Sequence, residues 1–237
     1  MTIILSLEGN IGSGKSTLLK QLTRTLPDRI LHRKIFFLQE PVKEWEKIKN
    51  ENGKTIIEEF YNDNTKWGFS FQMMAYISRL KCIRDLVKQN GSNIIIISER
   101  SLWTDKNVFA KMLYDSNDIN KINYKIYNTW FDEFSKEYPL NGIIYVDTNP
   151  EVSYKRVINR SRKGENNILK DYLENCDTYH KNWINKSEKP VLKIDGNGKD
   201  TFNMSSECFD NIINFIKDFT TNKVNFNYKE AMNKIYC

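Results

Sequence analysis

A glycine-rich stretch near the start of the chain has the residue types and spacing that bind phosphate. Residues 9–17 read Gly-Asn-Ile-Gly-Ser-Gly-Lys-Ser-Thr and match G-x-x-x-x-G-K-[ST]. The glycines let backbone N–H groups converge on an anion, and Lys15 supplies an ammonium for the β- and γ-phosphates. Ser16 supplies a hydroxyl for Mg²⁺. The residues predicted to bind ATP here are Gly9, Asn10, Ile11, Gly12, Ser13, Gly14, Lys15, Ser16 and Thr17.

Charged residues follow two of the predicted strands directly. Residues 34–39 run into Glu40, and the four isoleucines 94–97 run into Ser-Glu99-Arg100. Charges at such positions are costly to bury unless they have partners. Glu40 is a candidate general base for a substrate hydroxyl; the alternative is a surface glutamate before a turn. Glu99 is a candidate Mg²⁺ ligand, and Arg100 a candidate clamp for phosphate oxygens or the attacking hydroxyl.

An arginine-rich segment follows the predicted strand 142–146. Asn149 and Pro150 mark the start of a helix that carries three arginines on one side. Bidentate guanidinium groups suit the spreading charge of a phosphoryl group, so residues 156–168 are a candidate lid over the γ-phosphate. A solvated basic helix or a nucleic-acid patch is the alternative. The arginines are Arg156, Arg160 and Arg162.

Two further features have more than one interpretation. Residues 67–89 have the pattern of a long amphipathic helix, and Gln72 and Arg79 lie seven residues apart on one face of it. Taken alone, that spacing favours a solvated face. Asp195 and Gly196 begin a glycine-rich loop after the last predicted strand, which could pack against a nucleotide base or be only a turn.

The composition indicates a globular protein with a sizeable core. The chain has 237 residues, 40% of them apolar, and no repeat or linker divides it, so we expect one domain, 1–237. The net charge of +6 does not demand a nucleic-acid partner. Four cysteines without short paired spacing indicate reduced thiols, and no apolar run is long enough for a membrane span. We therefore expect a cytoplasmic protein.

Short apolar runs alternate with helical patterns along the chain. This alternation predicts an α/β fold with a parallel sheet covered by helices on both faces. Ligands of such folds bind outside the carboxyl ends of the strands. The segment 203–219 reads as helical, and the tail from about residue 222 has no predicted role. The five predicted strands are residues 2–7, 34–39, 94–97, 142–146 and 191–194.

Five motifs, in this order and spacing, resemble the deoxynucleoside kinase family, which includes the deoxycytidine, deoxyguanosine and mitochondrial thymidine kinases and the insect multisubstrate enzyme. The likeness extends from residue 3 to about residue 200. It implies a P-loop kinase fold with a five-stranded parallel sheet, an arginine-rich lid, and a homodimer formed through two long helices, 67–89 and roughly 121–137. The motifs are GNIGSGKST, EPVKEW, GFSFQ at 68–72, ERSLWTD and the segment 156–165.

The resemblance also implies roles for individual residues. Glu40 matches the family's general base, and Arg100 matches the arginine beside the sugar 5′-hydroxyl. Tyr61 and Glu165 match the pair that holds the 3′-hydroxyl, although Lys163-Gly164 is a less acidic entry to the lid than some members have. The implied catalytic residues are Glu40, Arg100 and Lys15. The implied substrate-binding residues are Glu40, Trp45, Ile57, Tyr61, Phe71, Gln72, Ala75, Arg79, Arg100, Asp105, Phe109 and Glu165.

Arg79 and Asp105 carry the expected base preference. The resemblance brings both near the base, where deoxycytidine- and deoxyguanosine-type enzymes have arginine and aspartate and thymidine-accepting members have smaller uncharged groups. Asp105 can accept from an exocyclic amine, which thymine lacks at C4, and an ordered Arg79–Asp105 pair would crowd the thymine methyl group. Polar groups left unpaired against the wrong substrate discriminate strongly. We therefore expect a preference for deoxycytidine and the deoxypurines over thymidine.

The expected reaction transfers the γ-phosphoryl of ATP to a deoxynucleoside 5′-hydroxyl, with Mg²⁺ held at Ser16 and Glu99. Four alternatives remain open from the sequence. A thymidylate-type monophosphate kinase would need a pocket for an acceptor phosphate, and a deoxynucleoside kinase of broad specificity would include thymidine. A nucleotide-gated nucleic-acid-binding protein would leave Glu40, Gln72 and Asp105 unused, and a silent scaffold would leave every catalytic position unused.

Overall fold

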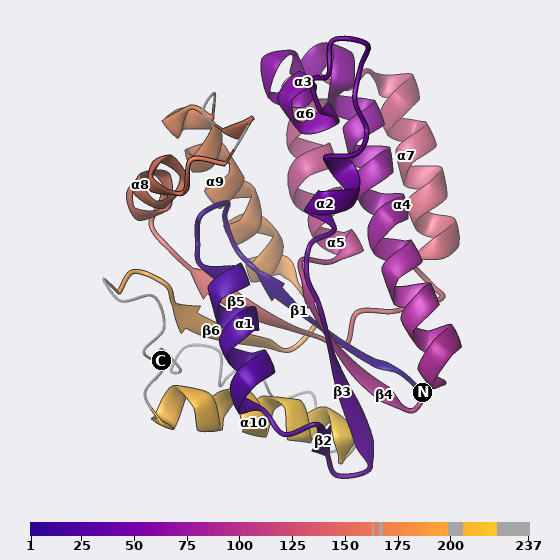
Figure 1. Cartoon of the computed structure of the whole chain (residues 1–237), viewed down its shortest axis with the longest axis vertical. Coiled ribbons are helices and arrows are strands. Elements are labelled where there is room, and N and C mark those ends of the chain that lie inside the picture. Colours follow the sequence, from indigo (N-terminus) through magenta and orange to yellow (C-terminus); the bar gives the residue numbers. More distant parts are fainter. Residues whose placement is uncertain (163, 166–167, 199–205, 222–237) are drawn as a thin grey trace.

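The fold is a mostly parallel sheet with helices on both faces (Figure 1). A computed structural model describes residues 1–162, 164–165, 168–198 and 206–221. The strands are β1 Ile3–Glu8, β2 Arg29–Ile30, β3 Arg33–Leu38, β4 Ile94–Glu99, β5 Gly142–Asp147 and β6 Val191–Asp195. The helices are α1 Lys15–Thr25, α2 Val42–Trp45, α3 Ile56–Asn62, α4 Asn64–Asn90, α5 Leu102–Thr104, α6 Lys111–Asp115, α7 Lys121–Phe134, α8 Pro150–Arg160, α9 Lys170–Lys186 and α10 Ser206–Thr220, and a π-helix, η1, spans Asp105–Ala110.

The strand order in the sheet is β2-β3-β4-β1-β5-β6. The five predicted strands are confirmed, and all of them pair in parallel. The predicted count of five was wrong by one, because the two-residue strand β2 pairs antiparallel with β3 at the edge. Strand β1 lies between β4 and β5, where the direction of chain progression through the sheet reverses. Such a switch point opens a crevice at the carboxyl ends of the strands.

The core is divided by the sheet into two layers. On one face, α1 and α10 pack leucine and isoleucine side chains against β1, β4 and β5. On the other face, Ile83 of α4 and Ile184 of α9 pack against Ile4, Ile96 and Ile143 of the sheet. The buried isoleucines of β4 contribute to both layers, as expected for a strand covered on both sides.

Helix α4 is longer than predicted, because Asp63 caps its start and Gly91, at a φ of 77°, ends it. The assignment of Gln72 and Arg79 to a solvated face was wrong, since their exposed fractions are only 2% and 6%. Ile77, on the same helix, is 48% exposed. Gln72 and Arg79 are buried because their part of the helix borders the cavity described below, whereas Leu80 and Ile83 of the same helix pack in apolar clusters.

Four smaller expectations can be compared with the structure. Predicted helix 121–137 corresponds to α7, and 203–219 corresponds to α10, although residues 203–205 lie outside the described part. Cys82, Cys176 and Cys208 form no disulfide with one another in the described part of the chain, and Cys237 and the tail from residue 222 lie outside it. Within the described residues, every helix is too short or too polar to span a bilayer.

Candidate active site

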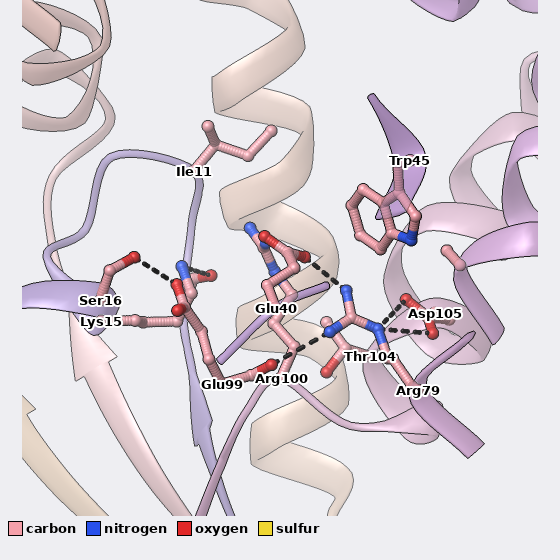
Figure 2. A network of polar contacts seen from close by, with 12 residues as sticks. Ile11, Lys15, Ser16, Glu40, Trp45, Arg79, Glu99, Arg100, Thr104 and Asp105 are labelled. Carbon is pink, nitrogen blue, oxygen red and sulfur yellow. Dashed lines mark hydrogen bonds and ion pairs between the residues drawn. The ribbon is translucent and has the colours of Figure 1, made fainter. Parts of the chain in front are cut away.

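A cavity of about 460 Å³ opens at the carboxyl ends of β1, β3 and β4. Its volume is within the range of small-molecule sites. The phosphate loop lines one end, and α4 and η1 line the other (Figure 2). The predicted site residues on its wall are Ile11, Gly12, Gly14, Lys15, Ser16, Thr17, Glu40, Trp45, Ile57, Tyr61, Phe71, Gln72, Ala75, Arg79, Glu99, Arg100, Asp105, Phe109, Arg156, Arg160, Arg162 and Glu165.

The phosphate loop needs glycine for two separate reasons. Gly12 has a φ of +79°, a left-handed conformation that side chains disfavour. A Cβ on Gly12 would also lie 2.4 Å from the carbonyl oxygen of Ser153 in α8. Gly14, at a φ of 101°, precedes α1 and provides no side-chain cap, and Gly14, Lys15 and Ser16 at this helix start line the cavity. The loop therefore presents backbone donors to an anion.

Lys15 is curled into the loop. Its Nζ donates to Gly9 O at 3.0 Å, Asn10 O at 2.6 Å and Ser13 Oγ at 3.3 Å. Burial, together with the neighbouring Arg100, lowers the pKa of Lys15 to about 7. A triphosphate bound in the loop would place negative charge beside the Lys15 amine and favour its protonated form.

Ser16 and Glu99 meet beside the loop, as Figure 2 shows. Ser16 Oγ donates to Glu99 Oε1 at 2.5 Å, and both residues line the cavity. The residues come from the start of α1 and the end of β4, and the parallel pairing of β1 with β4 brings them together. A hydroxyl and a carboxylate side by side form an oxygen donor set that suits Mg²⁺.

Two arginines and two acids form a buried network at the centre of the cavity (Figure 2). Arg100 Nη1 donates to both carboxylate oxygens of Glu40, at 2.8 and 3.0 Å. Arg79 Nη2 donates to Glu40 Oε1 as well, and Arg79 Nε donates to Asp105 Oδ2 at 3.0 Å. Arg79 Nη1 completes the network by donating to the carbonyl oxygen of Glu99 at 3.0 Å.

The pKa values of the two acids in this network are shifted in opposite directions. Burial alone would raise the pKa of Glu40, but Arg100 and Arg79 outweigh it and hold that pKa well below its usual range. Glu40 is therefore ionised at neutral pH. Burial raises the pKa of Asp105 to about 6, and Arg79 compensates only in part.

Arg100 keeps unused hydrogen-bonding capacity. Its backbone is in the left-handed region, at a φ of 63°, which is costly for a non-glycine residue and recurs at functional sites. Its Nε and Nη2 atoms are buried and have no partner among the described residues. These donors are available to an oxygen that enters the cavity.

Aromatic and apolar side chains form the far end of the cavity. Trp45, which the resemblance implies as a substrate-binding residue, belongs both to an apolar cluster and to the cavity wall. It packs in an apolar cluster with Ile57 and Ala75, lines the cavity, and donates from Nε1 to Ser78 Oγ at 2.9 Å. Gln72 is nearly fully buried, and its Oε1 has no partner among the described residues. An unpaired amide oxygen at a cavity wall is suited to read a ligand's polar edge.

The lid arginines divide into two groups. Arg160 and Arg162 both pair with the buried carboxylate of Glu165, Arg162 at 3.1 Å. Arg156 instead donates to the backbone oxygens of Ser13, Gly196 and Gly198, and so joins the phosphate loop to the loop after β6. Residues 163, 166 and 167 of the predicted lid lie outside the described residues.

Some predicted ATP-binding residues do not line the cavity. Asn10 turns its side-chain amide toward the carbonyl of Leu173, and Ser13 Oγ lies at the Lys15 ammonium. Asp195 accepts hydrogen bonds from Asn197, outside the cavity wall. The binding roles of all the predicted residues stay predictions, and the five that do not line the cavity are Gly9, Asn10, Ser13, Asp195 and Gly196.

The sequence reasoning missed four cavity residues. Tyr172 of α9 lies edge-on to Tyr61, with ring centroids 6.1 Å apart, and burial raises its pKa well above the ordinary value. No motif or spacing signals it, because α9 reaches the cavity only through its packing on α8 and η1. In the sequence, the other three residues are not distinguishable from an ordinary surface lysine and from apolar core residues. They are Lys20, Val42 and Phe60.

Together, the parallel sheet with its phosphate loop and the facing cavity define a P-loop phosphotransferase. The family model for deoxynucleoside kinase matches residues 5–221, and the chain belongs to the deoxynucleoside kinase family. It is an ATP-dependent kinase of deoxynucleosides. The thymidylate-type alternative is not favoured, because the relatives carry deoxynucleoside kinase names.

Three curated relatives illustrate the likeness. A fowlpox virus protein described as a probable deoxycytidine kinase is 34% identical over 224 residues, covering 90% of this chain and 88% of the relative. The mitochondrial deoxyguanosine kinase of Xenopus laevis is 30% identical over 243 residues, covering 91% and 88%. The deoxycytidine kinase of Homo sapiens is 29% identical over 224 residues, covering 81% and 83%.

Proposed function

We propose that this kinase phosphorylates deoxycytidine and the deoxypurine nucleosides at the 5′-hydroxyl in preference to thymidine. The observation that carries the proposal is the buried Arg79–Asp105 ion pair on the cavity wall that also holds Gln72. A charged pair fixed at that wall favours a base with an exocyclic amine and disfavours one with a methyl group. The names of the relatives, deoxycytidine and deoxyguanosine kinases, agree with this preference.

Base recognition is assigned to three side chains. Gln72 Oε1 has no partner among the described residues and accepts from the base edge, and Asp105 accepts from an exocyclic amine. The ring of Phe109 lies 5.1 Å from the Arg100 guanidinium and offers a face for stacking. Thymine would leave the Asp105 acceptor unmatched, and an unmatched buried acceptor costs about 1–3 kcal/mol.

Glu40 is assigned as the general base. Its carboxylate is ionised and oriented by two arginines, so it accepts the 5′-hydroxyl proton as that oxygen attacks the γ-phosphoryl. Because phosphoryl transfer proceeds through a loose transition state, a well-oriented base of low pKa is sufficient. The unpaired Nε and Nη2 of Arg100 stabilise the charge on the transferred oxygens.

The donor is assigned to the phosphate loop and the lid. Lys15 and the loop N–H groups bind the β- and γ-phosphates, and Arg160 and Arg162 lie within reach of the same cavity. Ser16 and Glu99 are the residues that would hold Mg²⁺, because their oxygens adjoin each other at the loop. When bound there, Mg²⁺ neutralises charge on the β- and γ-phosphates.

The sugar 3′-hydroxyl is assigned to Tyr61 and Glu165. Glu165 is buried and Tyr61 lines the same cavity, and burial together with the nearby Glu165 charge raises the pKa of Tyr61. A neutral phenol beside a carboxylate provides one donor and one acceptor for a hydroxyl.

A homodimer through α4 and α7 is part of the proposal. These helices pack against each other, with Tyr76 Oη donating to Trp130 O at 3.3 Å (Figure 1). On α7, Ile122, Ile126 and Trp130 recur every four residues and are 71%, 41% and 44% exposed. A row of exposed apolar side chains on one helix face is typical of a subunit interface. The single domain and the cytoplasmic location stay predictions.

A substrate panel tests the proposed preference. With ATP and Mg²⁺, kcat/KM is measured for deoxycytidine, deoxyadenosine, deoxyguanosine and thymidine, and thymidylate serves as the control for a monophosphate kinase. We expect thymidine to have the lowest kcat/KM of the four nucleosides and thymidylate to give no diphosphate. A kcat/KM for thymidine above that of the other three would contradict the proposed preference.

A further inference from the structure

One buried carboxylate beside the candidate active site has no part in the proposed chemistry. Glu8 ends strand β1, directly before the phosphate loop, and its side chain is fully shielded from solvent. Ser101 Oγ donates to Glu8 Oε1 at 2.7 Å, and Thr104 Oγ1 donates to Glu8 Oε2. No ion pair joins Glu8 to a cation in the described part of the chain, and burial raises its pKa. An acid held only by hydroxyls in the interior is costly, which indicates a specific role.

The two hydroxyls that bind Glu8 also form the capping box of α5. Ser101 Oγ accepts from the Thr104 N–H at 3.3 Å, and Thr104 Oγ1 accepts from the Ser101 N–H at 3.1 Å. A hydroxyl has one proton and two lone pairs. Because Glu8 accepts both protons, the lone pairs are left to face the backbone N–H groups. Without this acceptor the hydroxyls could rotate, and the start of α5 would be less firmly fixed.

Helix α5 connects two members of the ion-pair network. Arg100 precedes it in the left-handed conformation, and the Arg100 N–H donates to Leu7 O at 2.9 Å. Arg100 is therefore held by β1 on one side and by the capping box on the other. Asp105 follows α5 at the first position of η1, where it accepts from Arg79. The directions of both side chains depend on how α5 begins.

We infer that Glu8 is a positioning residue for the acceptor end of the cavity. Acting through Ser101 and Thr104, its carboxylate fixes the start of α5 and thereby the directions of Arg100 and Asp105. Since Glu8 adjoins Gly9, the same strand end aligns the phosphate loop with the ion-pair network. The inference rests on the proposed roles of Arg100 and Asp105 in binding the deoxynucleoside.

The substitution Glu8→Gln tests this inference, because the amide has the size of the acid but only one accepting oxygen. We expect kcat/KM for deoxycytidine to fall by about tenfold or more, while the KM for ATP changes by less than about twofold. The ratio of kcat/KM for deoxycytidine to that for thymidine should fall as well, since Asp105 is less well fixed. Wild-type values for kcat/KM and for this ratio would overturn the inference.

A double-mutant cycle with Thr104→Val tests the route of the effect. If Glu8 acts through the Thr104 hydroxyl, Glu8→Gln costs much less in the Thr104→Val background than in the wild type. Fully additive effects would overturn that route. The control is Ile212→Val in α10, on the opposite face of the sheet, which should lower the melting temperature and leave both kinetic ratios unchanged.

Two further variants keep the inference testable if Glu8→Gln does not fold. Thr104→Val and Ser101→Ala should each lower kcat/KM for deoxycytidine with little change in the KM for ATP, and wild-type kinetics in both would overturn the inference. The variant Arg100→Lys distinguishes a failure of the proposed role of Glu8 from a failure of the proposed role of Arg100. If it lowers kcat/KM for deoxycytidine while Glu8→Gln does not, only the role of Glu8 fails. If Arg100→Lys has no effect, the proposed role of Arg100 fails.

Discussion

The two ends of the cavity are built in different ways. The donor end is built mainly from one continuous segment, residues 9–17, with the lid arginines beside it, and we propose that the backbone of this segment and Lys15 bind the phosphates. The acceptor end is assembled from side chains that are distant in sequence. Glu40 follows β3, Arg79 lies on α4, and Asp105 begins η1, and these join Arg100 after β4 (Figure 2).

Because of this difference, we expect substitutions at the two ends of the cavity to affect different kinetic properties. At the donor end, conformation is fixed locally by glycines, so a single added Cβ should affect ATP binding and little else. At the acceptor end, two guanidinium groups balance the carboxylates of Glu40 and Asp105, and removing one partner leaves a buried charge uncompensated. Changes there should affect catalysis and base preference with ATP binding largely kept.

The largest effect is expected for Glu40→Gln. The amide cannot take the 5′-hydroxyl proton, so kcat should fall by about 10²-fold or more, the usual contribution of a general base. The dissociation constant of ATP, measured by calorimetry, should stay close to the wild-type value because Glu40 lies at the acceptor end. An unchanged kcat would remove Glu40 from the chemistry.

Next in size is the double substitution Arg79→Met with Asp105→Ala. Removing both members together keeps the charge of the network balanced, because Arg100 still pairs with Glu40, and opens space for the thymine methyl group. The ratio of kcat/KM for deoxycytidine to that for thymidine should fall by about tenfold or more. The single variant Asp105→Ala is the control, and it should lose more activity toward every nucleoside because Arg79 keeps its charge. If the double variant keeps the wild-type ratio of kcat/KM for deoxycytidine to that for thymidine, the Arg79–Asp105 pair does not set the base preference.

Gly12→Ala should act at the donor end alone. Its Cβ would lie 2.4 Å from the Ser153 carbonyl oxygen, so the loop must move. We expect the KM for ATP to rise about threefold to tenfold, a typical result of overpacking, with the KM for deoxycytidine unchanged. Gly53→Ala is a matched control, because Gly53 has a φ of +76° and nothing within 4 Å of the added Cβ. Equal effects of the two variants on ATP would contradict the steric explanation.

The smallest expected effect is a proton uptake on ATP binding. Lys15 has a pKa of about 7 in the nucleotide-free protein, so at pH 8 most of its amine is neutral. The triphosphate charge favours the ammonium and raises that pKa, so binding at pH 8 should take up a fraction of a proton. At pH 6 the group is already charged, and the uptake should vanish. Calorimetry in buffers of different ionisation enthalpy measures this, and no difference between pH 6 and pH 8 would contradict it.

The donor end could be predicted from the sequence because the residues that form it are contiguous. The phosphate pattern, the preceding apolar strand and the following leucine spacing all agree, and the structure has β1, the loop and α1 at those residues. The five parallel strands could be read for the same reason, since buried strands are continuous apolar runs. The two-residue β2 has no such signal.

The acceptor end could be predicted only in part. Helical spacing put Gln72 and Arg79 on one face, but periodicity alone does not distinguish a solvated face from one that borders a polar cavity. Their approach to Asp105 depends on the packing of η1 against α4, and no residue type marks a π-helix in this stretch. Glu8 gave no signal at all, because its partners lie more than ninety residues away.

The central claim is that one cavity holds the donor phosphates and the acceptor hydroxyl together. A bisubstrate compound that joins the 5′-oxygens of adenosine and deoxycytidine through a chain of phosphates tests this claim most directly, by steady-state inhibition against each substrate. We predict inhibition that is competitive with both ATP and deoxycytidine, because the compound fills both ends of the cavity at once. Competition with ATP alone, and none with deoxycytidine, would contradict it.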